Sequence, residues 1–442
     1  MKRFLVPLYL RYIKFFAKLR LGRIKPLIIG IGGSSGKSSL SHLVFFVLSE
    51  KLSVHSSKGK NSETGIPLDI LGIEIKDYTL YSWIKSAVET PFKLLFNKDK
   101  FDIYIAEMGI DSPYAPKNMS YLLSILKPNI AALTNIDIEH SMNFDDLVEG
   151  KHSKTRKEEI IKAIANEEGK LLKLLESNQK AVVNLDDPNI KNLLPLRANT
   201  LRVSEKNKNA DFYIKNIIQT KTDFEVKFRF LKDEFVVRIN QPLPAYYAIT
   251  IVMAIAVCFA SGVSIRKIID LIEKKFLLPP GRFSVFKGIK NTTIFDSSYN
   301  NSLKSAVGAI ELVGKIGEGS RKVAILGDMR ELGTLSKIQH EALAGVISKN
   351  IDFAILIGKD IQNYTSPKLK EESFNHLSFM TYSDAKDEIL KKIKAGDLIL
   401  VKGSQNELYL ERVVELLLLN KKDKDLLPRR GSFWDKKRRN TP

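Results

Sequence analysis

The sequence predicts an α/β protein. Its larger first part is expected to be a doubly wound, mostly parallel sheet that carries a phosphate-binding loop. A smaller Rossmann-like α/β domain is expected to follow. Three observations support this fold class: apolar strand-like runs alternate with helical segments, a glycine-rich loop joins the first such run to a helix, and a second series of strand-like runs follows a proline break. A chain of 442 residues is long enough for two or three domains with a sizeable core.

In the first part, short apolar runs bounded by polar or glycine residues mark the expected strands, at residues 27–33, 101–108, 130–136 and 181–185. Residues 37–49 are apolar at helical spacing and should form the first helix after the loop. Three β-rich runs with polar turns between them, residues 212–218, 224–230 and 235–239, predict a small antiparallel addition.

Residues 245–263 are nearly free of charge and about as long as a membrane span. Their alanines, together with Thr250, Ser261 and Gly262, and their position between α/β patterns favour a buried packing helix. We expect the single cysteine, Cys258, to pack inside this helix. One cysteine cannot form an internal disulfide, which favours a reducing, cytoplasmic compartment.

A boundary is expected at residues 278–281, Leu-Pro-Pro-Gly, because the two prolines break any helix. Further strand-like runs then follow at 292–296, 323–327, 353–358 and 397–402. The predicted organisation is therefore a basic amphipathic helix, a central domain that carries the glycine-rich loop, a C-terminal Rossmann-like domain and a basic disordered tail, at residues 1–26, 27–279, 280–420 and 421–442.

The formal net charge is +20 at pH 7, and part of the excess lies at the two ends of the chain. Such a charge is typical of proteins with anionic partners, but no nucleic-acid recognition motif accompanies it, and we expect no nucleic-acid partner. Residues 1–25 mix apolar and basic side chains without an uncharged run long enough to span a membrane. They form either a helix in peripheral contact with anionic lipid at the inner face of the membrane or a helix docked on the protein body.

The segment 30–39, Gly-Ile-Gly-Gly-Ser-Ser-Gly-Lys-Ser-Ser, follows a strand and opens a helix, which is the setting of a phosphate-binding loop. Backbone N–H groups of such a loop close around phosphate oxygens, and the helix N-terminus favours anions. Lys37 is expected to reach the β and γ phosphates, and the Ser38 hydroxyl to bind Mg²⁺. ATP is the expected nucleotide, although the loop by itself does not exclude GTP. The remaining loop residues expected at the nucleotide are Gly33, Ser34, Ser35, Gly36 and Ser39.

The glycine spacing, at residues 30, 33 and 36, resembles the loop of the Mur ligase superfamily. Other segments resemble the same family in the same order along nearly the whole chain, which makes the resemblance specific. These segments are 60–68 (Lys-Asn-Ser-Glu-Thr-Gly-Ile-Pro-Leu), 105–109 (Ile-Ala-Glu-Met-Gly), 134–140 (Thr-Asn-Ile to His140), 181–188, 280–282 (Pro-Gly-Arg), 295–301, 326–333 (Leu-Gly-Asp-Met-Arg-Glu-Leu-Gly) and 401–404 (Val-Lys-Gly-Ser).

The resemblance implies an ATP-dependent acid–amino-acid ligase that forms ADP and phosphate through an acyl phosphate. Such chemistry needs positioning and charge neutralisation rather than an enzyme nucleophile. The resemblance further implies that Glu107 and His140 hold a second Mg²⁺. A carbamylated lysine is expected at the same metal; Lys157 fits the Lys-x-Glu-Ile pattern, whereas Lys154 fits a gap-free spacing from His140.

The resemblance also assigns residues outside the loop. Arg282 is expected to meet the phosphates when the domains close. The expected nucleotide contacts are Asn184, Asp296, Tyr299 and Asn300, and the expected substrate contacts are Asn61, Lys402 and Ser404.

Some positions depart from the family pattern. Only 29 residues precede Gly30, whereas the family carries a UDP-binding domain there, so we expect that domain to be absent. Ser297 stands in place of a second aspartate, and Gln405 stands in place of an arginine after the Lys-Gly-Ser segment.

The expected function is the addition of D-alanyl-D-alanine or a similar dipeptide or amino acid to a nucleotide-linked or other small cell-wall precursor peptide, by a monomer. A Mur-type ligase of a polyglutamate or pseudopeptide pathway stays open, as does a non-catalytic, membrane-docked nucleotide-binding scaffold.

Overall fold

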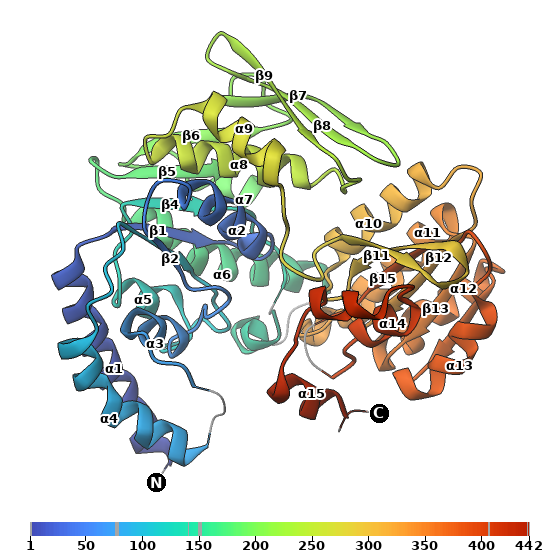
Figure 1. Ribbon diagram of the computed structural model, residues 1–442, viewed down its shortest axis with the longest axis horizontal. Helices are drawn as coiled ribbons and strands as arrows, with labels where there is room; N and C mark the ends of the chain where they lie inside the picture. Colours follow the sequence, from blue (N-terminus) through green and yellow to red (C-terminus); the bar gives the residue numbers. More distant parts are fainter. Residues whose placement is uncertain are drawn as a thin grey trace. The chain divides into compact units, whose positions relative to one another are not determined.

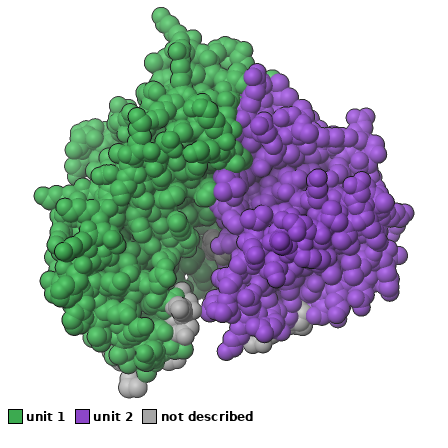
Figure 2. All heavy atoms as spheres, in the orientation of Figure 1, with its two compact units in different colours: residues 1–216, 227–237, 248–276 green, residues 217–226, 238–247, 277–442 purple. Residues whose placement is uncertain are grey.

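The computed structural model describes residues 2–75, 79–139, 141–148, 153–404, 407–439 and 441. The chain divides into two compact units, which Figure 2 shows in different colours. Unit 1 consists of residues 1–216, 227–237 and 248–276, and unit 2 of residues 217–226, 238–247 and 277–442.

The first sheet has nine strands in the order β2-β3-β1-β4-β5-β6-β7-β8-β9 (Figure 1). Strands β2 to β7 pair in parallel, with Ile31 opposite Glu107 and Gly32 opposite Leu133. Its strands are β1 (Leu27–Gly32), β2 (Val54–Ser56), β3 (Ile103–Glu107), β4 (Ile130–Leu133), β5 (Lys180–Asn184), β6 (Asn199–Ser204), β7 (Phe212–Gln219), β8 (Phe224–Phe230) and β9 (Asp233–Ile239). The doubly wound, mostly parallel fold class is confirmed.

The helices of this part follow the strands in the alternating order that the sequence predicts. They are α1 (Lys2–Ile24), α2 (Lys37–Leu48), α3 (Gly65–Leu71), α4 (Leu80–Phe96), α5 (Met119–Leu123), the 3-10 helix η1 (Ser141–Val148), α6 (Ser153–Lys173), α7 (Pro188–Lys191), α8 (Tyr247–Ala260) and α9 (Ile265–Lys275). The central strands are buried along their whole length, as is typical of a parallel sheet with helices on both faces.

Two predictions for the region after β6 are settled by burial and pairing. The β-rich runs do form strands, β7 to β9, and these strands extend the nine-stranded sheet at one end. Helix α8 is buried, and Cys258 lies inside it with no exposed surface. Among the described residues, no helix is long and apolar enough to cross a membrane.

Helix α1 is docked on the protein body through one face. Tyr9, Leu10, Ile13, Ala17 and Leu21 are buried at helical spacing. Within unit 1, α1 packs along α4, a helix that the sequence analysis did not predict (Figure 1).

The second sheet has six strands in the order β10-β11-β15-β12-β13-β14. All neighbours pair in parallel except β10 and β11. The strands are β10 (Ser284–Gly288), β11 (Thr292–Ser297), β12 (Lys322–Gly327), β13 (Phe353–Ile357), β14 (His376–Phe379) and β15 (Leu398–Lys402). Its helical elements are the 3-10 helix η2 (Ile289–Asn291), α10 (Leu303–Ile316), the 3-10 helix η3 (Gly333–Leu335), α11 (Ser336–Asn350), the π-helix η4 (Ile361–Thr365), α12 (Ser366–Glu371), α13 (Tyr382–Lys392), α14 (Glu411–Leu417), the 3-10 helix η5 (Lys421–Leu426) and α15 (Ser432–Arg439).

Apolar side chains of β12, β13 and β15 form one core with those of α13 and α14, which explains why this part of the chain is a compact unit. The strands β10 and β14 are short and partly exposed, and polar residues are therefore tolerated in them. Their sequences lack the continuous apolar run from which the other strands of this sheet were predicted.

The predicted disorder of residues 421–442 is wrong for the described part of that segment. Helices η5 and α15 are formed there, and Arg429 and Arg438 are buried. The basic composition suggested a solvated tail, but these arginines have a buried carboxylate as partner, described below.

Candidate active site

The loop between β1 and α2 has the geometry of a phosphate-binding loop. Gly33 and Gly36 have φ values of +120° and +83°, a backbone conformation that residues with a side chain rarely adopt. A Cβ atom on Gly33 would lie 2.2 Å from the Thr134 Oγ1 atom. The glycine at residue 33 is therefore required both by backbone conformation and by space.

The residues directly after β4 hold this loop in place. The Asn135 side chain accepts a hydrogen bond from the Ser35 N–H at 2.9 Å and donates one to the Ser35 hydroxyl at 2.7 Å. The Asn135 carbonyl accepts from the Ser34 N–H at 2.9 Å. Because β4 neighbours β1 in the sheet, the end of one strand lies beside the loop that follows the other. The Thr-Asn segment that the sequence singled out thus contacts the phosphate loop.

The structure brings Lys37, Ser38 and Glu107 together. The Ser38 hydroxyl donates a hydrogen bond of 2.9 Å to Glu107 Oε2. Glu107 is the last residue of β3 and is 3% exposed, and its N–H donates to the Ser57 hydroxyl at 3.0 Å. The Lys37 ammonium donates to the Gly33 carbonyl, and to the Ser34 carbonyl at 3.0 Å. A cation and two hard oxygen donors therefore lie at the mouth of the loop, a donor set that suits Mg²⁺ and phosphate.

Sequence reasoning missed a glutamate at the same loop. Glu168 of α6 is 2% exposed, and its Oε2 atom accepts a hydrogen bond from the Gly33 N–H at 3.0 Å. A signal was present in the sequence: residue 168 is separated by four and three residues from Ile164 and Leu171, two apolar positions that are buried on the same helix. A glutamate within this buried stripe needs a polar partner, and the loop supplies it.

Two further predicted residues lie near these groups in unit 1. The Asn61 carbonyl accepts from the Gly109 N–H at 3.2 Å, two residues after Glu107. Asn184 is buried at the end of β5, and its amide donates to the Thr134 carbonyl at 2.9 Å. Asn184 therefore supports the strand end that holds the loop.

The structure does not describe every predicted metal ligand. His140 and the side chain of Lys154 lie outside the described residues. Lys157 is half-buried in the first turns of α6, where the following Ile160 and Ile164 are buried as the predicted helix requires. Within the described ranges, no group of three or more His, Cys, Asp or Glu side chains forms a metal site.

In unit 2, the predicted residues gather at the ends of β11 and β15. The guanidinium carbon of Arg282 lies 4.7 Å from the centre of the Tyr299 ring, and that of Arg429 lies 4.9 Å from it. The Lys402 ammonium, whose residue is 2% exposed, donates to the Asn300 carbonyl. Because Ser297 is opposite Lys402 in the sheet, residues 299–300 and 402–404 extend from neighbouring strand ends.

Asp296 lies at the buried centre of this region. Its Oδ1 atom accepts from the Ser298 N–H at 2.9 Å, whereas its Oδ2 atom has no hydrogen-bond partner in the described part of the chain. Burial raises the pKa of Asp296 to about 6, and nearby Glu411 adds to the rise, while Ser298 and Arg429 lower it. Glu411 itself is fully buried and forms an ion pair of 2.6 Å with Arg429.

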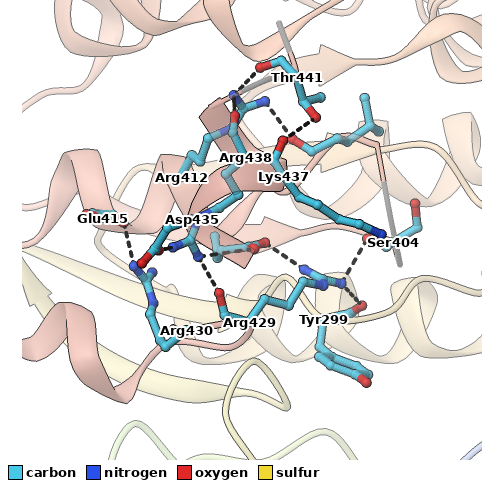
Figure 3. Close-up of polar contacts among 12 residues, drawn as sticks. Tyr299, Ser404, Arg412, Glu415, Arg429, Arg430, Asp435, Lys437, Arg438 and Thr441 are labelled. Carbon is cyan, nitrogen blue, oxygen red and sulfur yellow. Dashed lines mark hydrogen bonds and ion pairs between the residues drawn. The ribbon is translucent and has the colours of Figure 1, made fainter. Parts of the chain in front are cut away.

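Arg429 was not predicted, and it connects the C-terminal segment to this site (Figure 3). Besides the Glu411 pair, its guanidinium donates to the Tyr299 carbonyl and, at 3.2 Å, to the Ser404 carbonyl. Ser404 is 1% exposed, so its carbonyl depends on a protein partner. One buried arginine thus contacts two predicted site residues.

Two family models match the chain: the Mur ligase middle domain over residues 31–258, and the Mur ligase glutamate ligase domain over residues 281–405. Among curated proteins, the chain is 25% identical over 414 residues to UDP-N-acetylmuramoyl-tripeptide--D-alanyl-D-alanine ligase of Bacillus subtilis, covering 91% of this chain and 78% of that protein. It is 23% identical over 401 residues to the ligase of the same name from Escherichia coli, covering 89% and 77% of the two chains.

Solved structures share the fold. The MurF ligase from Thermotoga maritima in complex with ADP superposes with a TM-score of 0.74 at 22% identity, covering 94% of this chain and 84% of that one. A MurF structure from Acinetobacter baumannii gives a TM-score of 0.70 at 18% identity, covering 89% and 77%.

Proposed function

Because this chain belongs to the Mur ligase family, it is a ligase, and we propose that it uses ATP to join a carboxylate to an amine, with D-alanyl-D-alanine or a similar amine added to a cell-wall precursor peptide. The names of the curated relatives support this choice of substrates. ADP and phosphate are the other products. The alternative pathways differ from this proposal in substrate and not in chemistry.

The observation that carries the proposal is the Ser38–Glu107 hydrogen bond beside Lys37 in the glycine-rich loop. In the proposed reaction a carboxylate oxygen attacks the γ-phosphorus of ATP and ADP leaves. The amine nitrogen then attacks the acyl carbon, loses a proton, and phosphate leaves. Lys37 would neutralise charge on the transferred phosphoryl group, and the loop N–H groups would hold the phosphates in line.

Mg²⁺ fits the oxygen donors of Ser38 and Glu107. When bound, Mg²⁺ would neutralise phosphate charge and polarise the phosphoryl group. His140 and a carbamylated Lys157 complete the predicted ligand set. Ser57 would keep the Glu107 backbone at its position through the hydrogen bond to the Glu107 N–H.

In unit 2, the roles of six residues stay predictions. Tyr299 and Asn300, with Asp296, are proposed for the nucleotide, Arg282 for the phosphates, and Lys402 and Ser404 for the amine side. The position of the Arg282 guanidinium over the Tyr299 ring supports a shared role for these two, because a guanidinium suits a phosphate and an aromatic ring suits a base. We also propose that the protein acts as a cytoplasmic monomer with peripheral membrane contact through residues 1–25.

The test is phosphate release from ATP by the full chain, measured with each pair of a UDP-muramoyl peptide and an amine. We expect release that requires both D-alanyl-D-alanine and a tripeptide acceptor. Polyglutamate acceptors are assayed in parallel; release with these alone would move the protein to a polyglutamate pathway, and no release with any pair would remove the proposed substrates.

Glu107→Gln should lower kcat for this release by about 100-fold or more, because it removes the charge that faces the loop while keeping the shape of the side chain. Ser41→Ala is the matched control. Its hydroxyl lies on the same helix as Ser38, but it faces the Ser56 hydroxyl at 3.4 Å and not Glu107. Equal activity of the two variants would contradict the assigned role of Glu107.

A further inference from the structure

Helix α4 exposes an apolar stripe along its whole length. Tyr81, Ile84, Val88, Phe92, Leu95 and Phe96 are each more than half exposed. Their spacing of three and four residues places them on one face of the helix. Single exposed apolar residues are ordinary on a protein surface, but a contiguous stripe of this length marks an interaction site.

The opposite face of α4 is already occupied by α1, so the stripe does not serve the packing of these two helices. The Tyr9 hydroxyl is 2.6 Å from the Ser86 hydroxyl, and the Tyr12 hydroxyl donates to the Ala87 carbonyl at 2.9 Å. The rings of Tyr9 and Trp83 have their centres 4.8 Å apart. Helix α1 therefore fixes α4 on the protein body with the apolar stripe facing outward.

Helix α1 adds apolar side chains of its own to this surface. Leu5, Leu8, Phe15 and Leu19 are each at least 45% exposed. They lie on the helix face opposite the buried Leu10, Ile13 and Ala17, because residues seven or eleven apart share a face. The two helices run side by side in Figure 1, so their exposed side chains belong to one region of unit 1.

The charge of this region is strongly positive. The sequence of α1 contains seven basic residues and no acidic one. Arg11 and Lys18 are exposed between its apolar side chains. Helix α4 carries Lys85 and Lys93, and its one acidic residue, Glu89, is paired with Lys85 at 3.8 Å.

The combination of an apolar stripe with basic side chains beside it selects one partner. A second copy of the same surface would bring like charges together, which is unfavourable. A lipid surface with anionic head groups accepts both components, since apolar side chains enter the acyl-chain boundary while lysine and arginine reach the phosphates.

We propose that α1 and α4 form a docking surface for an anionic lipid bilayer, in which the apolar stripe of α4 is the inserting element. This goes beyond the contact expected from residues 1–25, because most of the exposed apolar side chains come from α4. It does not depend on the ligase reaction, and its failure would leave the proposed function intact.

The test is flotation of the full chain with vesicles of phosphatidylcholine, with and without phosphatidylglycerol. We expect the wild type to float with the phosphatidylglycerol vesicles and to be released by high salt. Val88→Glu combined with Phe92→Glu should weaken this partitioning by about tenfold or more. The melting temperature should not change, because both side chains are exposed.

Leu231→Glu combined with Leu426→Glu is the matched control. It also introduces two glutamates in place of apolar side chains, at positions elsewhere that are at least as exposed, and it should float like the wild type. Failure of the wild type to float, or equal flotation of the α4 variant, would overturn the proposal. A dimer in light scattering that the α4 variant converts to monomers, without vesicle binding, would assign the surface to a second copy instead.

Discussion

At the residue scale, Gly33 shows how one backbone position joins distant parts of the site. Its N–H is bound by Glu168, and its missing side chain leaves room for Thr134. The loop can therefore approach both the β4 strand end and helix α6. A side chain at this position would separate the loop from Thr134 and impose a strained φ.

Gly33→Ala should lower the free energy of unfolding by roughly 2–4 kcal/mol, from the strain of a positive φ together with the contact with Thr134. Urea unfolding measures this loss. Gly59→Ala is the control, because Gly59 also has a positive φ, +82°, but nothing lies within 4 Å of its Cβ position. It should lose only about 1 kcal/mol. Equal losses in the two variants would argue that Thr134 does not restrict the loop.

Asp296 is the second residue whose environment makes a measurable prediction. Its pKa of about 6 in the folded chain lies above its ordinary value of 3.8, because the buried charge is poorly solvated. The folded state then holds a proton that the unfolded state has lost between about pH 4 and pH 6. Stability contributed by this group is present at low pH and is lost as the pH rises through that window.

Asp296→Asn should therefore flatten the pH dependence of unfolding. Relative to the variant, the wild type should lose about 3 kcal/mol between pH 4 and pH 7, which corresponds to roughly two pKa units. The comparison uses the difference between the two proteins, because Glu411 also has a raised pKa and is present in both. The same slope in both proteins would show that Asp296 is ionised normally.

At the scale of elements, the C-terminal segment acts as part of unit 2. Arg429 pairs with Glu411 of α14, and Arg438 of α15 donates to the Arg429 carbonyl at 2.6 Å. Figure 3 shows how these arginines bring α15 beside the residues of the site. Arg429 places a positive charge beside Ser404, because its guanidinium donates to the Ser404 carbonyl at 3.2 Å.

Arg429→Met should lower the free energy of unfolding by about 3–5 kcal/mol, because it removes the nearer of the two arginines that pair with the buried Glu411 carboxylate and leaves only Arg438, at 3.7 Å. Arg430→Met is the matched control. Arg430 pairs with Glu415 at 2.8 Å, but Glu415 is 39% exposed, so its loss should be within about 1 kcal/mol. Arg429→Met combined with Glu411→Leu should recover much of the stability, and a loss that persists would point to the Tyr299 and Ser404 contacts instead.

At the scale of the whole molecule, binding of a nucleotide by the folded chain must raise its stability. A ligand at about 100 times its Kd adds roughly 2.7 kcal/mol if the unfolded chain does not bind it. The proposed site lies where the neighbouring strands β3, β1 and β4 of the nine-stranded sheet end. The rise in stability on nucleotide binding therefore reports on binding at the phosphate loop.

Thermal unfolding of the full chain should shift upward with ATP and Mg²⁺, and Lys37→Ala should abolish the shift. Lys51→Ala removes the same charge from an exposed lysine just after α2, and it should leave the shift unchanged. A full shift in the Lys37 variant would mean that the nucleotide binds elsewhere.

Local patterns in the sequence were sufficient to predict the parallel sheets and the phosphate loop. The alternation of apolar runs gave the parallel sheets, and the spacing of glycines before Lys37 and Ser38 gave the phosphate loop. These predictions succeeded because periodicity and turn chemistry act over a few residues.

Only the tertiary structure decided which distant groups meet. Glu168 is 135 residues from Gly33, and Arg429 is 130 residues from Tyr299. The disorder predicted for the basic C-terminal segment was wrong because its composition does not record that Glu411 is buried. Likewise, the packing of α1 against one face of α4 decides that the apolar stripe on the other face is exposed. A charge or an apolar side chain is assigned its role by its spatial neighbours, and those are set by packing of the whole chain.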